Sequence, residues 1–130
     1  MKLTIERLHT LNAADLGDLQ KIWPQQTPQA WQRGLDNGGA LFVARFNDRL
    51  LAAVKVTQDN GIATLRDLMV REVTRRRGVG LYLVEDTLRQ LPDIHAWQLP
   101  LGDIPPAQLA IMDGFMRACG FSRRPEGWRR

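Results

Sequence analysis

The chain has 130 residues, of which 44% are hydrophobic and 25% are charged, as expected for one globular domain spanning residues 1–130. Its longest apolar runs, such as Leu50 to Val54, are far shorter than the ~20 residues needed to cross a bilayer, and the N-terminal segment lacks the apolar stretch of an export signal. The single cysteine, Cys119, excludes an internal disulfide and a multi-cysteine zinc site, and the net charge of +4 favours an anionic partner. We therefore expect a soluble, cytoplasmic protein.

The N-terminal third predicts one strand followed by two helices. Residues 2–7 alternate apolar and polar side chains, as a half-buried strand does. Asn12 has the character of an N-cap for a helix that Pro24 stops. Thr27 followed by Pro28 predicts the start of a second, shorter helix.

The middle of the chain predicts an antiparallel meander of three strands. Residues 40–46, 50–57 and 62–70 are rich in β-forming side chains. They are separated by short turn segments, one of which is Asn60-Gly61. A meander of this kind supplies the centre of a sheet.

The C-terminal half predicts two further helices and the last strands. A helix with Leu81, Val84, Leu88 and Leu91 on one face ends before Pro92, and residues 94–99 form a strand. A last helix has an apolar face of Leu109, Met112, Phe115 and Cys119, is closed by Gly120, and is followed by short strands. The element order βααβββαβαβ(β) indicates an α/β fold with a mixed central sheet flanked by helices.

The segment between the third meander strand and the next helix carries the clearest functional signal. It reads Val70-Arg71-Glu72-Val73-Thr74-Arg75-Arg76-Arg77-Gly78-Val79-Gly80. Glycines let the backbone approach a ligand, and the free amides at a helix start, together with the helix dipole, favour a pyrophosphate. The dense arginine group suits a compact phosphate cluster better than a long polyanion. A glycine-rich turn with a solvated basic face and a nucleic-acid-binding loop remain the alternatives.

Two motifs resemble the GNAT acetyltransferases. Arg-x-x-Gly-x-Gly, here Arg75 to Gly80, is similar to the pyrophosphate-binding motif of that family, and residues 115–121 are similar to its aromatic-Tyr-x-x-x-Gly-Phe motif. The resemblance implies a GNAT domain that binds an acyl-CoA, with the pantetheine arm lying along the strand that leads into the loop. In active members the tyrosine commonly acts as the general acid, and Met116 stands there in this chain.

Acid–base candidates elsewhere are few. The side chains considered are Asp67, Glu72, His9, His95, Tyr82 and Cys119. None has a partner at a spacing diagnostic of a catalytic pair, and Cys119 has the position of a buried thiol. We therefore name no catalytic residue, although an active N-acetyltransferase acting on a small amine or a protein N-terminus remains the alternative.

The chain as a whole resembles the PanM/PanZ family, GNAT-fold maturation factors of L-aspartate α-decarboxylase (PanD). The resemblance is carried by residues 1–5, 18–24, 44–47, 49–54 and 70–80 and by the Phe115 to Phe121 motif, and residues 25–39 and 99–110 lie outside it. It implies a monomer that binds acetyl-CoA, docks onto the PanD zymogen, promotes its self-cleavage to the pyruvoyl form, and restrains the mature oligomer in pantothenate and CoA biosynthesis. No metal, membrane or nucleic acid is implied.

The same resemblance assigns roles to particular residues. Leu68, Met69 and Val70 contact the pantetheine. The pyrophosphate and the 3′-phosphate are held by Thr74, Arg75, Arg76, Arg77, Gly78, Val79, Gly80 and Leu81. Arg45, Asn47 and Arg71 are the candidates for contact with PanD, although Asn47 also suits a turn and Arg45 also suits a solvated strand position.

Overall fold

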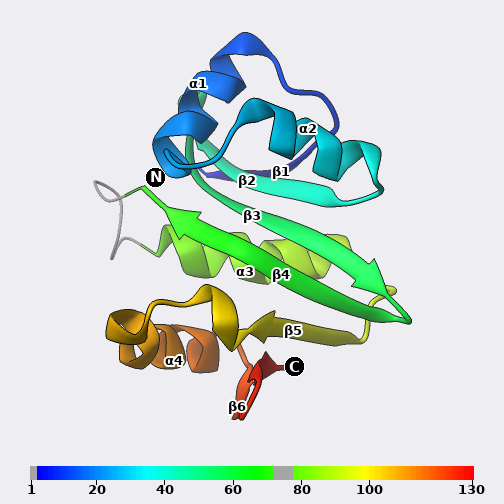
Figure 1. Cartoon of the computed structure of the whole chain (residues 1–130), viewed down its shortest axis with the longest axis vertical. Helices are drawn as coiled ribbons and strands as arrows, with labels where there is room; N and C mark the ends of the chain where they lie inside the picture. Colours follow the sequence, from blue (N-terminus) through cyan, green and yellow to red (C-terminus); the bar gives the residue numbers. More distant parts are fainter. Residues whose placement is uncertain (1–2, 72–77) are drawn as a thin grey trace.

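A single mixed sheet organises the molecule (Figure 1). The computed structural model describes residues 3–71 and 78–130. Within these residues the sheet has seven strands in the order β1-β2-β3-β4-β5-β7-β6. The strands are β1 (Thr4–Leu8), β2 (Ala40–Phe46), β3 (Arg49–Asp59), β4 (Ile62–Val70), β5 (Ala96–Pro100), β6 (Ser122–Arg124) and β7 (Gly127–Arg129). The helices are α1 (Ala13–Ile22), α2 (Pro28–Asp36), α3 (Val79–Gln90) and α4 (Leu109–Ala118), with short 3-10 turns η2 (Leu101–Asp103) and η3 (Pro106–Gln108).

The predicted helix caps are confirmed. The side chain of Asn12 accepts a hydrogen bond from the backbone N–H of Asp15 at 2.8 Å and begins α1. The side chain of Thr27 accepts one from Ala30 at 3.2 Å and begins α2, with Pro28 in the first turn. Each cap satisfies an amide that the first helical turn would otherwise leave without a partner.

Strands β1 to β4 pair antiparallel in sequence, and β4 then pairs with β5 in parallel. The β2–β3 turn places Asn47 and Asp48 at φ 49° and 65°, the left-handed conformation that a tight hairpin turn requires. The β4–β5 pairing covers Ile62–Thr64, opposite Ala96–Gln98. Because a parallel connection needs a crossover, α3 passes over one face of the sheet between these strands (Figure 1).

Each face of the sheet has its own core, because successive strand residues point to opposite sides. In β2, Leu41 and Val43 pack with Trp23 and Trp31 under α1 and α2. Their neighbours in β2, Phe42 among them, pack on the other face with residues of α3 and α4. The two helical layers therefore lie on opposite faces of one sheet.

The two predicted apolar helix faces pack on the core, but the most deeply buried positions are not all among the predicted ones. In α3, Leu83, Val84 and Thr87 are fully buried, whereas Leu81, Leu88 and Leu91 lie at the margin of the core. In α4, Met116 and Cys119 enter the core, while Met112 and Phe115 are only half-buried. The crossing angle of each helix on the sheet sets the buried stripe, and sequence spacing alone does not contain that angle.

Candidate functional site

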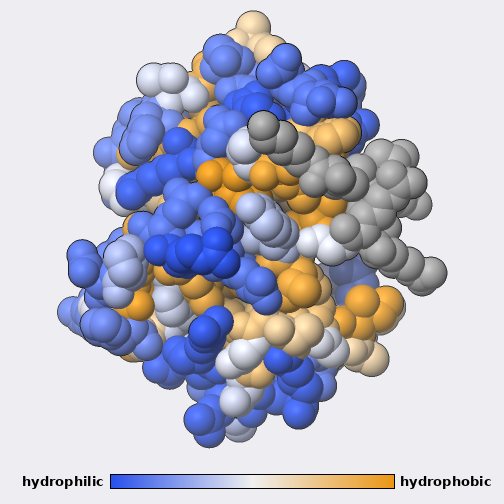
Figure 2. All heavy atoms as spheres, turned by 180° about the vertical axis from the view of Figure 1, so that it is seen from behind, coloured by the Kyte–Doolittle hydropathy of each residue, from blue (hydrophilic) through white to orange (hydrophobic). Residues whose placement is uncertain are grey.

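A pocket of about 550 Å³ lies where β4, the start of α3 and α4 meet. Its wall is formed by Leu68, Met69, Val70, Gly78, Val79, Gly80, Leu81, Gln108, Ile111, Met112 and Phe115. Figure 2 shows apolar surface gathered on one face of the molecule. A second pocket of about 110 Å³, between α2 and the sheet, is too small for a nucleotide-sized ligand.

The described wall of the large pocket is apolar apart from one amide side chain. Leu68, Met69 and Val70 come from β4, and Met112 and Phe115 come from α4. Gln108 supplies the amide group. Apolar walls with few polar groups are typical of sites that bury an uncharged, flexible part of a ligand.

The start of α3 forms the polar end of the pocket. Gly78 has φ +75° and precedes the helix without a side-chain cap. The first backbone amides of α3 therefore have no capping side chain. They lie at the N-terminal end of the helix, where the helix dipole is positive. Such an end binds anions, phosphate groups above all.

Gly80 allows the pocket walls to approach each other. A Cβ at this position would lie 3.0 Å from Cγ2 of Val70 and 3.2 Å from Cε2 of Phe115. Real Cβ atoms rarely come this close to neighbours, so the glycine keeps β4, α3 and α4 in close contact. The glycine predicted from sequence to bring backbone near a ligand thus also sets the distance between three elements.

The structure brings seven of the predicted ligand residues together. Leu68, Met69, Val70, Gly78, Val79, Gly80 and Leu81 all line this one pocket. Thr74, Arg75, Arg76 and Arg77 lie outside the described residues, as does the base candidate Glu72. The β4–β5 pairing ends at Thr64 and Gln98 while β4 continues to Val70, so the pocket end of β4 is not paired with β5.

Sequence reasoning missed the α4 wall. Gln108, Ile111, Met112 and Phe115 line the pocket, and Ile111 is 75% exposed. A signal was present, because the apolar positions of this helix span more than the single stripe that one core face needs. The apolar positions beyond that stripe, of which Ile111 is the clearest, form the surface that lines the pocket.

The position compared with the GNAT tyrosine lies in the core. Met116 has no exposed surface, and its neighbour Phe115 is the residue that reaches the pocket. Burial raises the pKa of the Cys119 thiol to about 12, so the thiol stays protonated near neutral pH. The prediction of a buried thiol is therefore confirmed.

The remaining acid–base candidates are dispersed. Tyr82 is 43% exposed, and the two histidines are also exposed, His9 directly after β1 and His95 directly before β5. Asp67 is in an ion pair with Lys55, with its Oδ2 atom 2.9 Å from Nζ. Among residues 3–71 and 78–130, no three metal-binding side chains gather in one place.

The three predicted partner residues share one end of the sheet. Asn47 lies in the turn between β2 and β3, and Arg45 precedes it on β2. Arg71 follows β4, and its backbone N–H donates to the carbonyl of Leu51 near the start of β3 at 2.8 Å. Because β4 runs into the start of α3, this end of the sheet also holds the pocket.

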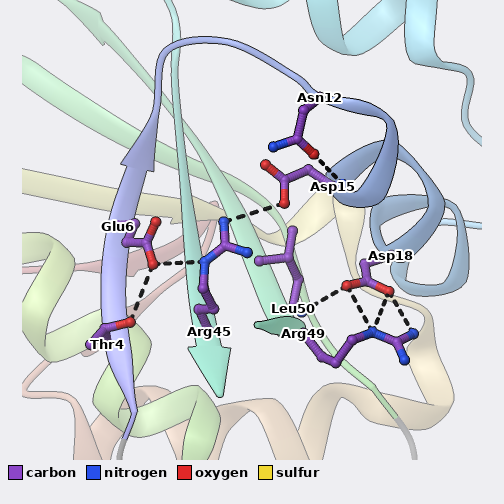
Figure 3. A network of polar contacts seen from close by, with 8 residues as sticks. All are labelled: Thr4, Glu6, Asn12, Asp15, Asp18, Arg45, Arg49 and Leu50. Carbon is purple, nitrogen blue, oxygen red and sulfur yellow. Dashed lines mark hydrogen bonds and ion pairs between the residues drawn. The ribbon is translucent and has the colours of Figure 1, made fainter. Parts of the chain in front are cut away.

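A network of ion pairs fixes the β2–β3 hairpin against α1 (Figure 3). Arg45 donates to Glu6 on β1 at 2.7 Å and to Asp15 on α1 at 3.2 Å. Burial alone would lower the pKa of Arg45, but the two carboxylates raise it above its ordinary value, so the guanidinium stays charged. Arg45, 21% exposed, is thus a braced strand residue rather than a solvated one.

Asp18 holds the other side of the same hairpin. Its carboxylate accepts hydrogen bonds from Nε and Nη2 of Arg49 and from the backbone N–H of Leu50, at 2.7–3.2 Å. Asn47 is exposed between the two braced arginines, Arg45 and Arg49. The hairpin therefore presents Asn47 on a rigid support.

No helix in the described part of the chain is both long and apolar enough to cross a membrane.

The chain matches known proteins over nearly its whole length. Residues 2–129 match the family described as "Acetyltransferase (GNAT) domain, PanZ". The PanD regulatory factor of Escherichia coli K12 is 46% identical over 128 residues, and that of Salmonella typhimurium LT2 is 44% identical; each match covers 98% of both chains.

A solved structure extends the likeness to three dimensions. The E. coli protein YhhK, determined by solution NMR bound to coenzyme A, superposes with a TM-score of 0.87 and 45% identity, covering 100% of this chain and 98% of that one. The mixed sheet with helices on both faces is therefore a GNAT fold. This chain belongs to the PanZ family of GNAT domains.

Proposed function

We propose that the chain, acting as one GNAT domain, binds acetyl-CoA in the large pocket and, in that form, regulates PanD. It promotes autocatalytic cleavage of the PanD zymogen and restrains the mature decarboxylase when acetyl-CoA is abundant. Family membership and relatives named PanD regulatory factor support the partner. The relative solved with coenzyme A supports the ligand.

The observation that carries the ligand assignment is the match between the two ends of the pocket and the two parts of CoA. The pyrophosphate fits the start of α3, where Gly78 to Leu81 present uncapped amides. Thr74 to Arg77 precede this point in the chain and supply charge for the 3′-phosphate. The pantetheine fits the apolar wall of Leu68, Met69 and Val70.

The partner surface adjoins the ligand. Arg45, Asn47 and Arg71 lie at the sheet end where β4 leads into α3, so a partner docked there lies next to the bound ligand. A ligand that contacts both proteins, or that favours one docking-competent form, couples its own concentration to docking. Acetyl-CoA thus serves as a signal held in the pocket, and the protein works as a cytoplasmic monomer that binds the PanD oligomer without nucleic acid or membrane.

The test is cleavage of purified PanD zymogen, followed by mass spectrometry, with and without acetyl-CoA. We expect the wild-type chain to accelerate cleavage only when acetyl-CoA is present. Absence of acceleration under both conditions contradicts the proposal. Steady release of free CoA thiol across a panel of amines, at ordinary enzyme rates of ~1–1000 per second, would instead indicate an active acetyltransferase.

Two asparagines make a matched pair of variants for the partner surface. Asn47 and Asn60 both lie in hairpin turns with positive φ, 49° and 53°, so replacement by Ala costs each turn a similar strain. They lie at opposite ends of β3. We expect Asn47→Ala to reduce zymogen cleavage at least about tenfold, equivalent to about 1.4 kcal/mol, with acetyl-CoA affinity retained. Asn60→Ala should leave cleavage unchanged; an equal effect of both variants refutes docking through this hairpin.

A further inference from the structure

The part of β4 that lines the pocket begins within a bulge. Between the pairs Ala53–Met69 and Lys55–Arg66, β3 contributes one residue and β4 contributes two, Asp67 and Leu68. An extra residue in one strand bends it and changes the direction of the side chains that follow. The position of the bulge therefore decides how Leu68, Met69 and Val70 meet the ligand.

The bulge uses a backbone conformation that its residue does not favour by itself. Asp67 has φ +54°, in the left-handed region, and it is not a glycine. Such a conformation persists where surrounding contacts hold it. The structure supplies those contacts from outside the pocket wall.

Three side chains hold Asp67 directly. The indole Nε1–H of Trp23 donates to the backbone carbonyl of Asp67 at 2.8 Å. Lys55 Nζ and Gln26 Nε2 both donate to its Oδ2 atom, at 2.9 and 3.2 Å. The backbone and the side chain of one residue are thus fixed by separate donors.

The holding groups are fixed in turn by each other. Lys55 Nζ donates to Gln26 Oε1 at 2.7 Å and lies 4.9 Å from the centre of a Trp23 ring. Trp31 Nε1 donates to the same Gln26 oxygen at 2.8 Å. Trp23 and Gln26 come from the end of α1 and the segment before α2. The side chains that contact Asp67 therefore lie on the face of the sheet covered by α1 and α2, opposite the face of α3 and α4.

We propose that Trp23, Gln26 and Lys55 are positioning residues for the ligand: they lock the Asp67 bulge and so hold the Leu68–Val70 backbone where the pantetheine binds. We call this cluster the bulge lock. It rests on the proposed function for the identity of the ligand. Because phosphate contacts are made at the start of α3, the bulge lock affects the pantetheine part of CoA and leaves the nucleotide part unaffected.

The experiment compares two tryptophans that each lose one indole N–H. Trp23→Phe removes the donor to Asp67, and Trp128→Phe removes the donor to Asp113, a 3.0 Å bond outside the pocket. Both tryptophans are buried, at 4% and 1% exposure, so the general cost to packing is comparable. Affinities for CoA and for adenosine 3′,5′-bisphosphate are measured by calorimetry on each folded variant.

We expect Trp23→Phe and Lys55→Met to weaken CoA binding about fivefold or more, with the affinity for the bisphosphate unchanged within about twofold. Trp128→Phe should change neither affinity. Adding Asp67→Asn to Lys55→Met should restore part of the CoA affinity, because asparagine tolerates the left-handed conformation and leaves no unpaired carboxylate. Unchanged CoA binding in Trp23→Phe, or equal loss of both ligands, overturns the proposal.

A second readout needs no ligand. Amide chemical shifts of Leu68, Met69 and Val70 should move in Trp23→Phe and remain in place in Trp128→Phe; shifts that stay in place in both variants count against the bulge lock. If wild-type protein failed to bind CoA, the proposed function would fall, while this measurement would still decide whether the bulge lock holds the strand.

Discussion

At the scale of single residues, Asp18 is a carboxylate that the fold buries with its hydrogen-bond partners in place. Its exposed fraction is 4%, and it accepts bonds from Arg49 and from the N–H of Leu50. Burial alone would raise its pKa, but these donors, chiefly Arg49, hold the pKa below its ordinary value (Figure 3). The charged form is therefore the one that stabilises the hairpin.

This gives a pH-dependent prediction. A carboxyl group with a lowered folded pKa contributes stability above its unfolded value of about 3.9, and the contribution disappears as pH falls through the folded pKa. We expect Asp18→Asn to lower the free energy of unfolding by about 2 kcal/mol at pH 7. Urea unfolding should show the difference from wild type shrinking below about pH 4. Asp59→Asn, at an exposed position, is the control, and a difference that stays constant down to pH 3 contradicts the assignment.

Residues with local signals were predictable, and residues that depend on tertiary contacts were not. Asn12 and Thr27 cap helices as expected, because a cap needs only its own next three residues. The bulge at Asp67 was not predicted, since its cause lies in Trp23, Gln26 and Lys55, which are distant in sequence or on another strand. Long-range donors of this kind leave no pattern in the strand itself.

At the scale of elements, helices α3 and α4 both line the pocket, and each contains one glycine. The surroundings of the two glycines differ. Gly80 in α3 lies against Val70 and Phe115, whereas Gly114 in α4 has no neighbour within 4 Å of an added Cβ. Both glycines have helical backbone, so alanine offers the same gain in helix propensity at each.

We expect Gly114→Ala to raise the free energy of unfolding by about 0.5–1 kcal/mol and to leave CoA affinity unchanged. In Gly80→Ala, steric contact of the new methyl group with Val70 and Phe115 should cancel the gain in the free energy of unfolding. The same contact should weaken CoA binding, because it pushes Val70 and Phe115 apart. Thermal unfolding and calorimetry measure the two effects. Equal CoA affinity in both variants would mean that this part of the wall does not contact the ligand.

The order and type of the elements followed from sequence because strand alternation, turn residues and caps agreed with one another along the chain. The predicted β4 bounds of 62–70 are those observed. The buried stripe of α3 and the pocket face of α4 did not follow, because Leu83, Thr87 and Phe115 acquire their surroundings only when each helix packs on the sheet.

At the scale of the whole molecule, the proposed ligand and partner surfaces lie at one end of the sheet. The β2–β3 turn, Arg71 after β4 and the start of α3 are all at that end. The glycine-containing part of the loop was recognised from its sequence and context, and Gly78 to Leu81 line the pocket. The position of Asn47 at this end of the sheet could not be predicted from local sequence, because it depends on the register of β3 with β2 and with β4.

The short β4–β5 pairing has a consequence for the cooperativity of the fold. Only Ile62–Thr64 join the N-terminal meander to β5 in the described sheet, so the C-terminal strands are attached through a narrow seam. CoA bound between β4 and α4 would act as a non-covalent cross-link across that seam and suppress its local opening. We expect amide hydrogen exchange of Gln98, which lies opposite Thr64 across that seam, to slow when CoA saturates the protein, and that of β6 at the sheet edge to remain unchanged. Unchanged exchange at Gln98 would show that the two halves hold together without the ligand; slowed exchange would show that bound CoA stabilises the seam.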